Sequence, residues 1–309
     1  MPDLRRGVLF GIAAYTMWGL FPLYWPLLKP SGSVEILAHR MVWSLVVVVA
    51  ALAVRRHWSW IKQIARQPAK LALLTVAAVV VTVNWGTYIY AVNTGHVVES
   101  ALGYFINPLV SVLFGVVLLR ERLRPLQWVA VGFAALAVLV LTIDYGRLPW
   151  IALTLAFSFG LYGLVKKQAN VAATESLAVE TLVLLVPALA YLVFLQGTGA
   201  ATFGREGVWH TALLVGAGLI TAVPLICFGA AAIRVPLSTI GVLQYIAPIL
   251  QFACGVLIVG EVMPSSRWIG FSIVWLALAI FTYDSFRTAR TAARSRVTTP
   301  KAQPERSTT

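Results

Sequence analysis

Charged residues are scarce in this chain of 309 residues, since only 11% of it is Asp, Glu, Lys or Arg. A soluble domain carries roughly 25% charged residues, so this chain could not cover its surface with polar groups in water. Hydrophobic residues make up 60% of the sequence. Apolar runs of ~20 residues, each long enough to cross a ~30 Å hydrocarbon layer, recur along almost its whole length. The sequence therefore predicts an all-α polytopic membrane protein.

Cysteines and catalytic motifs are also scarce. The two cysteines, Cys227 and Cys254, fall inside apolar runs, and we interpret them as packing residues rather than as a disulfide or a metal pair. The chain has no phosphate-binding P-loop, no HExxH and no Gly-x-Ser-x-Gly elbow. These absences argue against ATP hydrolysis and against the enzyme classes that use those motifs. We therefore predict no cofactor, no metal and no enzymatic activity.

Hydropathy predicts ten transmembrane helices, most of them joined by short connections. The segment 55–70 interleaves basic residues with Trp and Ile, which predicts that it lies on the cytoplasmic membrane surface. The tail is basic and then rich in Thr, Pro and Gln, so 286–309 is predicted to be disordered. The predicted spans are 7–28, 34–54, 71–92, 96–119, 126–143, 149–165, 176–195, 208–232, 237–260 and 268–284.

The net charge of +13 is distributed unevenly between the two sides of the predicted membrane. With the N-terminus inside, the cytoplasmic segments hold 19 Lys and Arg residues and the opposite side holds 4. Because basic residues accumulate on the cytoplasmic side, this ratio predicts that both termini face the cytoplasm. Membrane orientation explains the basic residues, so no nucleic-acid partner is expected.

An internal repeat organises the chain. Pro108, Gly115, Glu121, Trp128 and Asp144 recur 140 residues later as Pro248, Gly255, Glu261, Trp268 and Asp284. We predict two repeats of five spans each, 1–146 and 147–285. Because five is odd, the second repeat must sit upside down relative to the first, and inverted repeats are a recurring design of secondary transporters.

Prolines inside the predicted spans mark candidate helix breaks. Pro108 frees the carbonyl of Tyr104 and Pro248 frees that of Gln244, since proline has no N–H to donate. In a bilayer such carbonyls need other partners or line a cavity. Neighbouring Ser or Thr side chains could also satisfy them, but the two related positions favour a cavity wall. Pro224 is a third candidate break, and Pro22 and Pro187 are further ones.

Arg40 is the costliest residue to place in a bilayer, because it lies about five residues into the second span. It could extend to the external interface, or it could face inward and meet an anionic substrate or a carboxylate. His39 beside it points about 100° away around the helix. Glu180 is the repeat partner of Arg40 and has the opposite charge. We predict that Arg40 and His39 recognise charge or act in gating, and that Glu180 has a gating or coupling role.

Further polar residues cluster on the third, fourth and ninth spans. Taken singly, each is more readily explained by hydrogen bonds between helices. As a set they predict a pocket lined by aromatic and amide groups. Glu99, at the start of the fourth span, is the candidate for proton coupling. The predicted substrate-binding residues on these spans are Asn84, Trp85, Tyr88, Tyr104, Asn107, Gln244 and Tyr245.

Several segments of the chain resemble the RarD type of EamA transporter in the drug/metabolite transporter superfamily. They are Glu35-Ile-Leu-Ala-His-Arg40, Asn84-Trp85, Ser100-Ala-Leu-Gly-Tyr-Phe-Ile-Asn-Pro-Leu109, Pro224-Leu225 and Gly241-Val-Leu-Gln-Tyr-Ile-Ala-Pro248. The resemblance covers about 7–284. It implies an inner-membrane permease of ten helices, with the substrate path between two five-helix repeats and the fifth and tenth helices outside that path. The segment Gly260-Glu-Val-Met-Pro264 lacks the usual basic residue after the glutamate, so equal roles for Glu121 and Glu261 are not implied.

The sequence thus predicts a secondary transporter of a small metabolite or drug-like solute that works by alternating access. Family analogy favours efflux. The expected partners are a small-molecule substrate, membrane lipid and a coupling proton. One alternative is a lipid-modifying enzyme that uses His39 and Glu99 as acid and base, which requires the two side chains to converge. Another is a membrane scaffold, which predicts polar residues sealed by packing.

Overall fold

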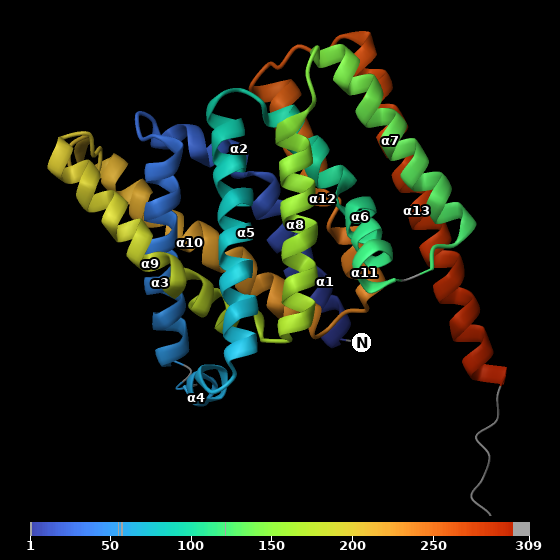
Figure 1. Cartoon of the computed structure of the whole chain (residues 1–309), viewed down its shortest axis with the longest axis horizontal. Helices are drawn as coiled ribbons and strands as arrows, with labels where there is room; N and C mark the ends of the chain where they lie inside the picture. The colour runs from blue at the N-terminus through green and yellow to red at the C-terminus, as the bar shows by residue number, and fades with distance from the viewer. Residues whose placement is uncertain (1, 55, 57, 121, 299–309) are drawn as a thin grey trace, which may run out of the picture.

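The structure is a computed structural model that describes residues 2–54, 56, 58–120 and 122–298 (Figure 1). Throughout these ranges the chain forms helices joined by turns, without a strand. The long helices are α1 (Pro2–Gly19), α3 (Ser33–Val54), α5 (Pro68–Asn93), α6 (Val97–Leu119), α7 (Pro125–Tyr145), α8 (Trp150–Ala169), α9 (Ala173–Thr198), α10 (Gly207–Ala232) and α13 (Ser265–Thr298). The short ones are α2 (Phe21–Tyr24), η1 (Trp25–Leu28), α4 (Ser59–Ala65), α11 (Leu237–Leu243), α12 (Ile246–Ala253) and η2 (Cys254–Ile258).

The helices have the length and composition of a polytopic membrane protein, as predicted. Eight candidate spans in the described chain are long and apolar enough to cross a membrane, and counting the bent pair formed by α1 and α2–η1 gives nine. Hydropathy predicted ten spans, and the one that is missing from these nine is α8. This helix has 20 residues, and its last turn carries Lys166 and Lys167.

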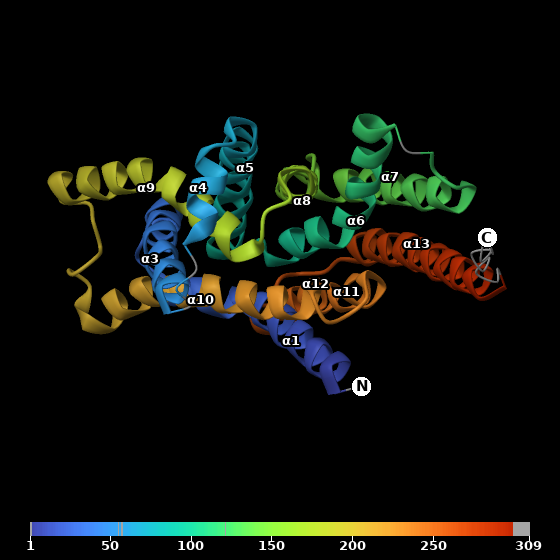
Figure 2. The ribbon, with the colours of Figure 1, turned by 90° about the horizontal axis from the view of Figure 1, so that it is seen from below.

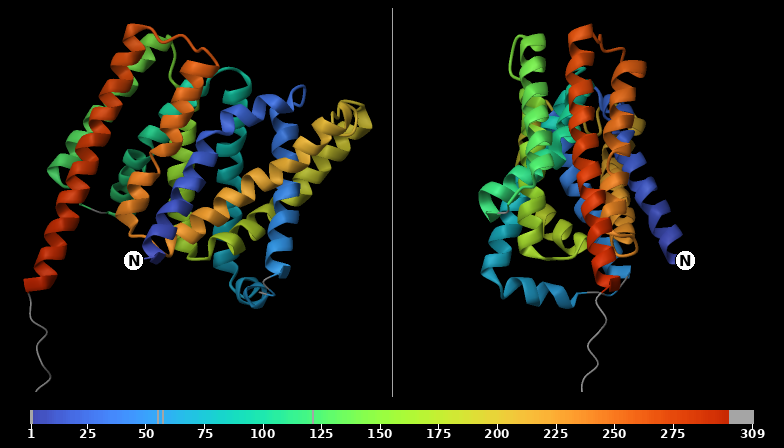
Figure 3. Two further views of the ribbon diagram at one scale, coloured as in Figure 1. Left: turned by 180° about the vertical axis from the view of Figure 1, so that it is seen from behind. Right: turned by 90° about the vertical axis from the view of Figure 1, so that its right-hand side faces the viewer.

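The long helices from α1 to α10 run in alternating directions, and the short helices α11, α12 and η2 together return the chain before α13. The N-terminus of α1 and the C-terminal end of α13 therefore lie at the same end of the molecule (Figures 1 and 3). The connection that contains α4 lies at this end too (Figure 1). We call it the basic end, because it carries the predicted cytoplasmic basic residues, including Lys62, Arg124 and Lys166. The opposite end, with the turns that contain Lys29, Arg147 and Arg267, is the far end.

The helices of the two predicted repeats interlock (Figure 2). The first helix of the first repeat, α1, packs against α10 and α12 of the second. The first helix of the second repeat, α8, packs in the same way against α5 and α6 of the first. In addition, α3 packs against both α9 and α10, and α7 packs along α13 at one edge of the molecule. The contacts between the repeats therefore occur in matched pairs.

Two glycines illustrate this matching at the level of single residues. A Cβ built on Gly19 of α1 would lie 2.7 Å from the Leu250 Cβ of α12, and one built on Gly160 of α8 would lie 3.3 Å from the Val110 Cγ1 of α6. Gly160 follows Gly19 by 141 residues, and Leu250 follows Val110 by 140. The missing side chains let the helices approach closely, as is common between membrane helices.

Ion pairs join α7 and α13 at both ends. At the far end, the Arg267 Nε lies 3.0 Å from the Asp144 Oδ2. At the basic end, the Arg124 Nε donates to the Asp284 Oδ2 at 2.7 Å. The two aspartates are repeat partners. The α7–α13 pair is thus held by the same type of contact at either end.

The first predicted span is not one helix. The axis bends by 42° between Asp3–Gly19 and Phe21–Leu28. Pro22 and Pro26 lie just after the bend and cannot donate backbone hydrogen bonds, so they favour an interrupted helix. The ninth predicted span is also divided, because α11 ends at Leu243 and α12 begins at Ile246. This second break includes Gln244, whose carbonyl Pro248 leaves without an N–H donor.

The structure differs from the predictions made for the other prolines and for the tail. Helix α6 continues through Pro108, and α10 continues through Pro224, so neither proline divides its helix. Helix α13 continues to Thr298, beyond the predicted start of the disordered tail at 286. The rest of the predicted tail, 299–309, lies outside the described residues, as does Glu121.

Candidate functional site

Arg40 lies in α3 with its side chain buried, and only 3% of the residue is exposed. Its guanidinium carbon is 3.8 Å from the centre of the Trp85 ring, 5.2 Å from Trp25 and 5.7 Å from Phe21. The Nε donates a hydrogen bond of 2.8 Å to the Thr221 Oγ1. The cation is therefore held among aromatic rings of the first repeat and a hydroxyl of the second. It is buried inside the protein and does not extend to the protein surface.

The environment of Arg40 stabilises its charge only in part. Each aromatic contact is worth roughly 0.5–2 kcal/mol, depending on solvent access. Among the described residues, no carboxylate forms an ion pair with Arg40, and its Nη1 has no hydrogen-bond partner. The Trp25 Nε1 and the Tyr88 hydroxyl are likewise buried without a partner. Buried polar atoms are normally hydrogen-bonded, so these three donors stand out as unused.

Asn84 and Tyr104 form a satisfied network next to this group. The Asn84 Nδ2 donates to the Leu155 carbonyl at 3.0 Å and to the Ser158 Oγ at 2.9 Å. Its Oδ1 accepts the Tyr104 hydroxyl at 3.2 Å. The Tyr104 ring also meets the Tyr88 ring edge-on, with centres 5.7 Å apart. Asn84 therefore joins α5, α6 and α8, as an interhelical packing contact would.

His39 points away from Arg40 toward the far end. Its ring stacks on Phe203 with centres 4.7 Å apart, and its Nδ1 accepts from the Trp43 Nε1 at 3.3 Å. One turn earlier, Glu35 accepts from the Thr202 backbone N–H at 2.8 Å. Both residues hold the connection between α9 and α10 against α3. The structure thus separates His39 from the aromatic group around Arg40.

Glu99 is buried at the far end and forms a multiple contact. Its carboxylate binds Arg147 through two hydrogen bonds, of 2.8 and 3.3 Å. It also accepts from the Ile151 N–H at 3.1 Å, which places a negative charge at the N-terminus of α8. The hydrogen bond with Glu99 raises the pKa of Arg147. Glu99 therefore ties the start of α6 to the start of α8.

Glu180 is buried near the basic end, in a different environment from Arg40. Its carboxylate pairs with the Lys166 Nζ at 2.8 Å and accepts the Tyr162 hydroxyl at 3.0 Å. Ser176, one turn earlier in α9, also donates to it. These contacts join α8 and α9. Within the described chain, Glu180 and Arg40 thus have separate partners.

The remaining predicted residues lie on α6 and along the divided ninth span. The Asn107 Oδ1 is buried without a partner. The Gln244 side chain donates to the Gly241 carbonyl of its own turn at 3.1 Å. Tyr245 packs against the cluster formed by α6, α7, α8 and α13. The structure therefore associates Trp85, Tyr88 and Tyr104 with Arg40, but not Gln244 or Tyr245.

A second glutamate forms a contact between two spans at the far end. Glu261 follows η2, and its carboxylate accepts the Val98 backbone N–H at 3.0 Å, at the first turn of α6. Burial raises the pKa of Glu261, while the N–H groups of Val98 and Val97 act in the opposite direction. Gly255 of η2 lies close beside Val98, because a Cβ built on it would be 2.8 Å from the Val98 Cγ2. The fourth and ninth spans therefore meet closely at this end.

Comparison with known proteins assigns the chain to a family. The EamA-like transporter family matches residues 5–143. Protein RarD of Streptomyces exfoliatus is 60% identical over 302 residues, which cover 98% of this chain and 95% of that protein. This chain belongs to the RarD type of EamA-like transporters. Protein RarD of Escherichia coli is 42% identical, covering 94% and 98% of the two chains. The chloramphenicol-sensitive protein RarD of Pseudomonas aeruginosa is 34% identical, covering 94% and 97%.

A solved structure supports the fold of this EamA-type chain. It is a crystal structure with a TM-score of 0.58, and it covers 91% of this chain and 98% of its own. The sequence identity is 19%, so the likeness concerns the fold alone. Together with the apolar helices, the family assignment identifies the chain as a multi-pass membrane transporter.

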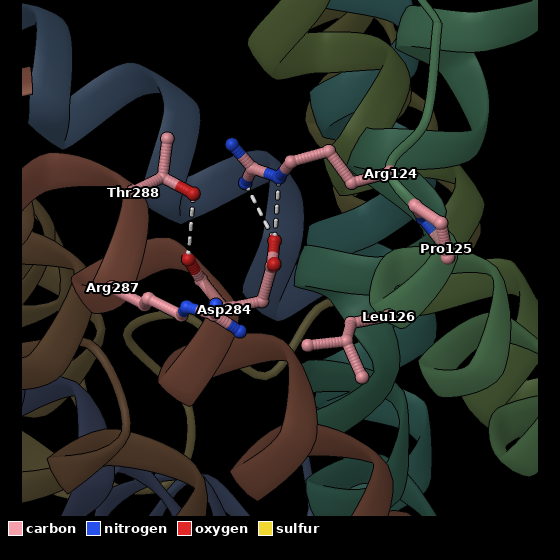
Figure 4. Close-up of a pocket in the computed structure, with 6 residues that line it drawn as sticks. All are labelled: Arg124, Pro125, Leu126, Asp284, Arg287 and Thr288. Carbon is pink, nitrogen blue, oxygen red and sulfur yellow. Dashed lines mark hydrogen bonds and ion pairs between the residues drawn. The ribbon is translucent and has the colours of Figure 1, made fainter. Parts of the chain in front are cut away.

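A surface pocket of about 400 Å³ lies apart from Arg40 in this EamA-type structure, at the basic end between α7 and α13 (Figure 4). Arg124 and Asp284 form an ion pair in it, and Thr288 donates to the Asp284 backbone carbonyl at 2.9 Å. Pro125, Leu126 and Arg287 complete its lining. The resemblance predicted that these two helices lie outside the substrate path, so we do not assign this pocket to the substrate. No group of three or more potential metal ligands occurs in the parts of the chain that the structure describes.

Sequence reasoning missed three residues of the EamA-type site: Phe21, Trp25 and Thr221. Pro22 directly follows Phe21 and Pro26 directly follows Trp25, so the two prolines could have indicated a bend that brings these aromatic residues inward. Thr221 has no comparable signal. It reaches Arg40 only because α10 of the second repeat packs on α3 of the first.

Proposed function

We propose that this chain is a secondary transporter that moves a small organic solute out of the cell by alternating access. It would lie in the cytoplasmic membrane with the basic end, and hence both termini, in the cytoplasm. The two halves would be inverted five-helix repeats, 1–146 and 147–285. The observation that carries the proposal is the buried cation of Arg40, which has no carboxylate partner and lies where helices of both halves meet.

The matched contacts between the halves support the inverted arrangement. Gly19 on Leu250 and Gly160 on Val110 are equivalent under the repeat, and so are Asp144 and Asp284 at the two ends of the α7–α13 pair. Two similar halves can pack in two mirrored ways of similar energy. That is the physical requirement for a protein that opens alternately to either side.

Polar contacts hold helices together at the far end. Glu99 with Arg147 and Glu261 with Val98 join helix termini there. We infer that transport requires the far-end contacts to break, and Glu99 remains our candidate for coupling this step to a proton.

The rival reading as a lipid-modifying enzyme has less support. It requires His39 and Glu99 to converge on one reacting group. His39 is stacked on Phe203, whereas Glu99 is bound to Arg147 and the N-terminus of α8. Three unused donors around Arg40 also favour a ligand site over a scaffold whose polar groups are all sealed by packing.

The test is transport by purified protein in proteoliposomes, with a panel of solutes and with or without a pH gradient. We expect Arg40→Ala to abolish transport while membrane insertion and helix content stay normal. The matched control is Arg205→Ala, because Arg205 is an exposed arginine that contacts only a loop carbonyl among the contacts described. Transport by Arg40→Ala with unchanged kinetics would refute the role of Arg40.

A further inference from the structure

Three buried hydrogen-bond donors from three elements lack an acceptor, and two of them, on Trp25 and Tyr88, belong to one hydrophobic cluster. They are the Nη1 of Arg40 on α3, the Nε1 of Trp25 on η1 and the hydroxyl of Tyr88 on α5. All three residues are at least 97% buried. The Arg40 guanidinium lies 5.2 Å from the Trp25 ring and within electrostatic range of Tyr88 and Tyr104. Because water-excluded donors rarely remain unpaired, this arrangement calls for an acceptor that the chain itself does not provide.

The buried carboxylates of the described chain are all committed to other partners. Glu35 caps the Thr202 N–H, Glu99 binds Arg147, Glu180 binds Lys166 and Asp284 binds Arg124. An intramembrane arginine almost always has a compensating partner. An anionic acceptor from outside the protein would satisfy the free Arg40 donor and would also neutralise its charge.

The surroundings also restrict the rest of the ligand. Trp85 and Phe21 present their ring faces to the guanidinium, and Tyr104 lies edge-on to Tyr88. The Thr221 hydroxyl already accepts from Arg40 and donates to the Ala217 carbonyl. The group around Arg40 thus offers apolar surface and donors but little acceptor capacity. A ligand with an apolar body and one oxyanion fits this chemistry, and a cationic ligand does not.

We propose that the transported solute is a small organic monocarboxylate, whose carboxylate binds Arg40 with Trp25 and Tyr88 as additional donors. This inference rests on the proposed function, because the bound carboxylate is a substrate only if the protein transports it. Binding itself can be measured without transport. Arginine suits this role because its planar group forms two parallel hydrogen bonds with a carboxylate.

The experiment measures equilibrium binding by the purified full-length protein in detergent at pH 7. Trp25 and Trp85 flank Arg40, so quenching of tryptophan fluorescence reports occupancy of the site. The probes are matched pairs of a carboxylate and its neutral amide: acetate and acetamide, valerate and valeramide, and phenylacetate and phenylacetamide. For at least one pair, the carboxylate should bind about tenfold or more tightly than the amide, since hydrogen bonds to charged groups are the stronger ones.

Two variants and a control test the assignment to Arg40. Arg40→Gln should bind the carboxylate and the amide of each pair equally, while Arg40→Lys should retain a reduced preference, because it keeps the charge but not the planar group. The control variant Arg205→Gln, at the far end, should show the same preference for the carboxylate as the wild type. The proposal is overturned if wild-type protein prefers no carboxylate in any pair, or if folded Arg40→Gln keeps the preference.

The outcomes separate this inference from the proposed function. Carboxylate-selective binding that is lost in Arg40→Gln, together with flux of the same carboxylate in proteoliposomes, supports both. Flux of neutral solutes without carboxylate selectivity overturns the monocarboxylate assignment and leaves transport in place. Selective binding without flux of any bound carboxylate supports the site and contradicts the transport function.

Discussion

Replacing Gly218 with alanine tests the contact that positions Arg40. Gly218 lies in the middle of α10, against the backbone of Trp43 in α3. A Cβ at position 218 would lie 2.4 Å from the Trp43 carbonyl carbon and 2.5 Å from its oxygen. Backbone atoms cannot rotate away as a side chain can. The matched control is Gly229→Ala in the same helix, because a Cβ at that position meets nothing within 4 Å.

The expected magnitude follows from this geometry. Both substitutions gain the same helix propensity, ~0.8–1 kcal/mol, so this contribution cancels in their difference. Overpacking of a tight contact costs about 1–3 kcal/mol. Ordinary contact begins near 3.4 Å, so relieving the 2.4 Å approach requires a separation of α3 and α10 by about 1 Å, the difference between the two. The hydrogen bond of 2.8 Å from Arg40 to Thr221 would then lengthen to about 3.8 Å, beyond hydrogen-bond range.

The assay is the free energy of unfolding of each variant in an SDS titration, together with carboxylate binding by fluorescence. We expect Gly218→Ala to be less stable than Gly229→Ala by about 1–3 kcal/mol. Its carboxylate binding should also weaken, because Arg40 loses its link to α10. Gly229→Ala should be at least as stable as the wild type. Equal stabilities of the two variants would refute the close packing of α3 on α10.

Two further predictions concern the glutamates of the far end. Burial raises the pKa of Glu261, near Arg267 and Glu99, so the folded state binds this proton more tightly than the unfolded chain does. Stability should therefore fall as pH rises from the unfolded value near 4.5 through the raised pKa, and Glu261→Gln should flatten this slope in unfolding measurements at several pH values. A variant that unfolds with the same pH dependence as the wild type would contradict this. Glu99→Gln keeps an acceptor for the Ile151 N–H but loses the charge that pairs with Arg147. We therefore expect transport by this variant to stop responding to a pH gradient, while exchange without a gradient continues. Full acceleration by the gradient in this variant would exclude Glu99 as the coupling group.

The helical membrane fold was accessible from the sequence because hydropathy reports directly on membrane crossing. Span boundaries agree closely in places, such as 34–54 for the helix Ser33–Val54. Pro22 was among the candidate helix breaks, but the apolar run gave no sign that the first span bends by 42° there. Helix α8 was predicted as a span but is not among the candidate spans of the structure, and two lysines lie in its last turn.

The site was less accessible, because the rotation of each helix about its axis is set by its neighbours. Arg40 drew attention through the cost of its burial, which needs no tertiary information. Which side chains face it depends on packing, and Thr221 lies 181 residues further along the chain. Asn84 shows the same limit, because only the structure reveals that α8 satisfies its amide.

Arg40 and Glu180 occupy equivalent positions in the two repeats, and the difference between them bears on the number of binding sites. Glu180 has a lysine and two hydroxyl donors, so its charge is neutralised within the protein. Arg40 has aromatic rings and one hydroxyl, so its charge is not. If both halves had kept the same chemistry, the symmetry would give two equivalent sites on opposite sides of the membrane. Because Arg40 alone of this pair lacks a charged partner among the described residues, we expect a single anion site, which each alternating conformation would expose in turn.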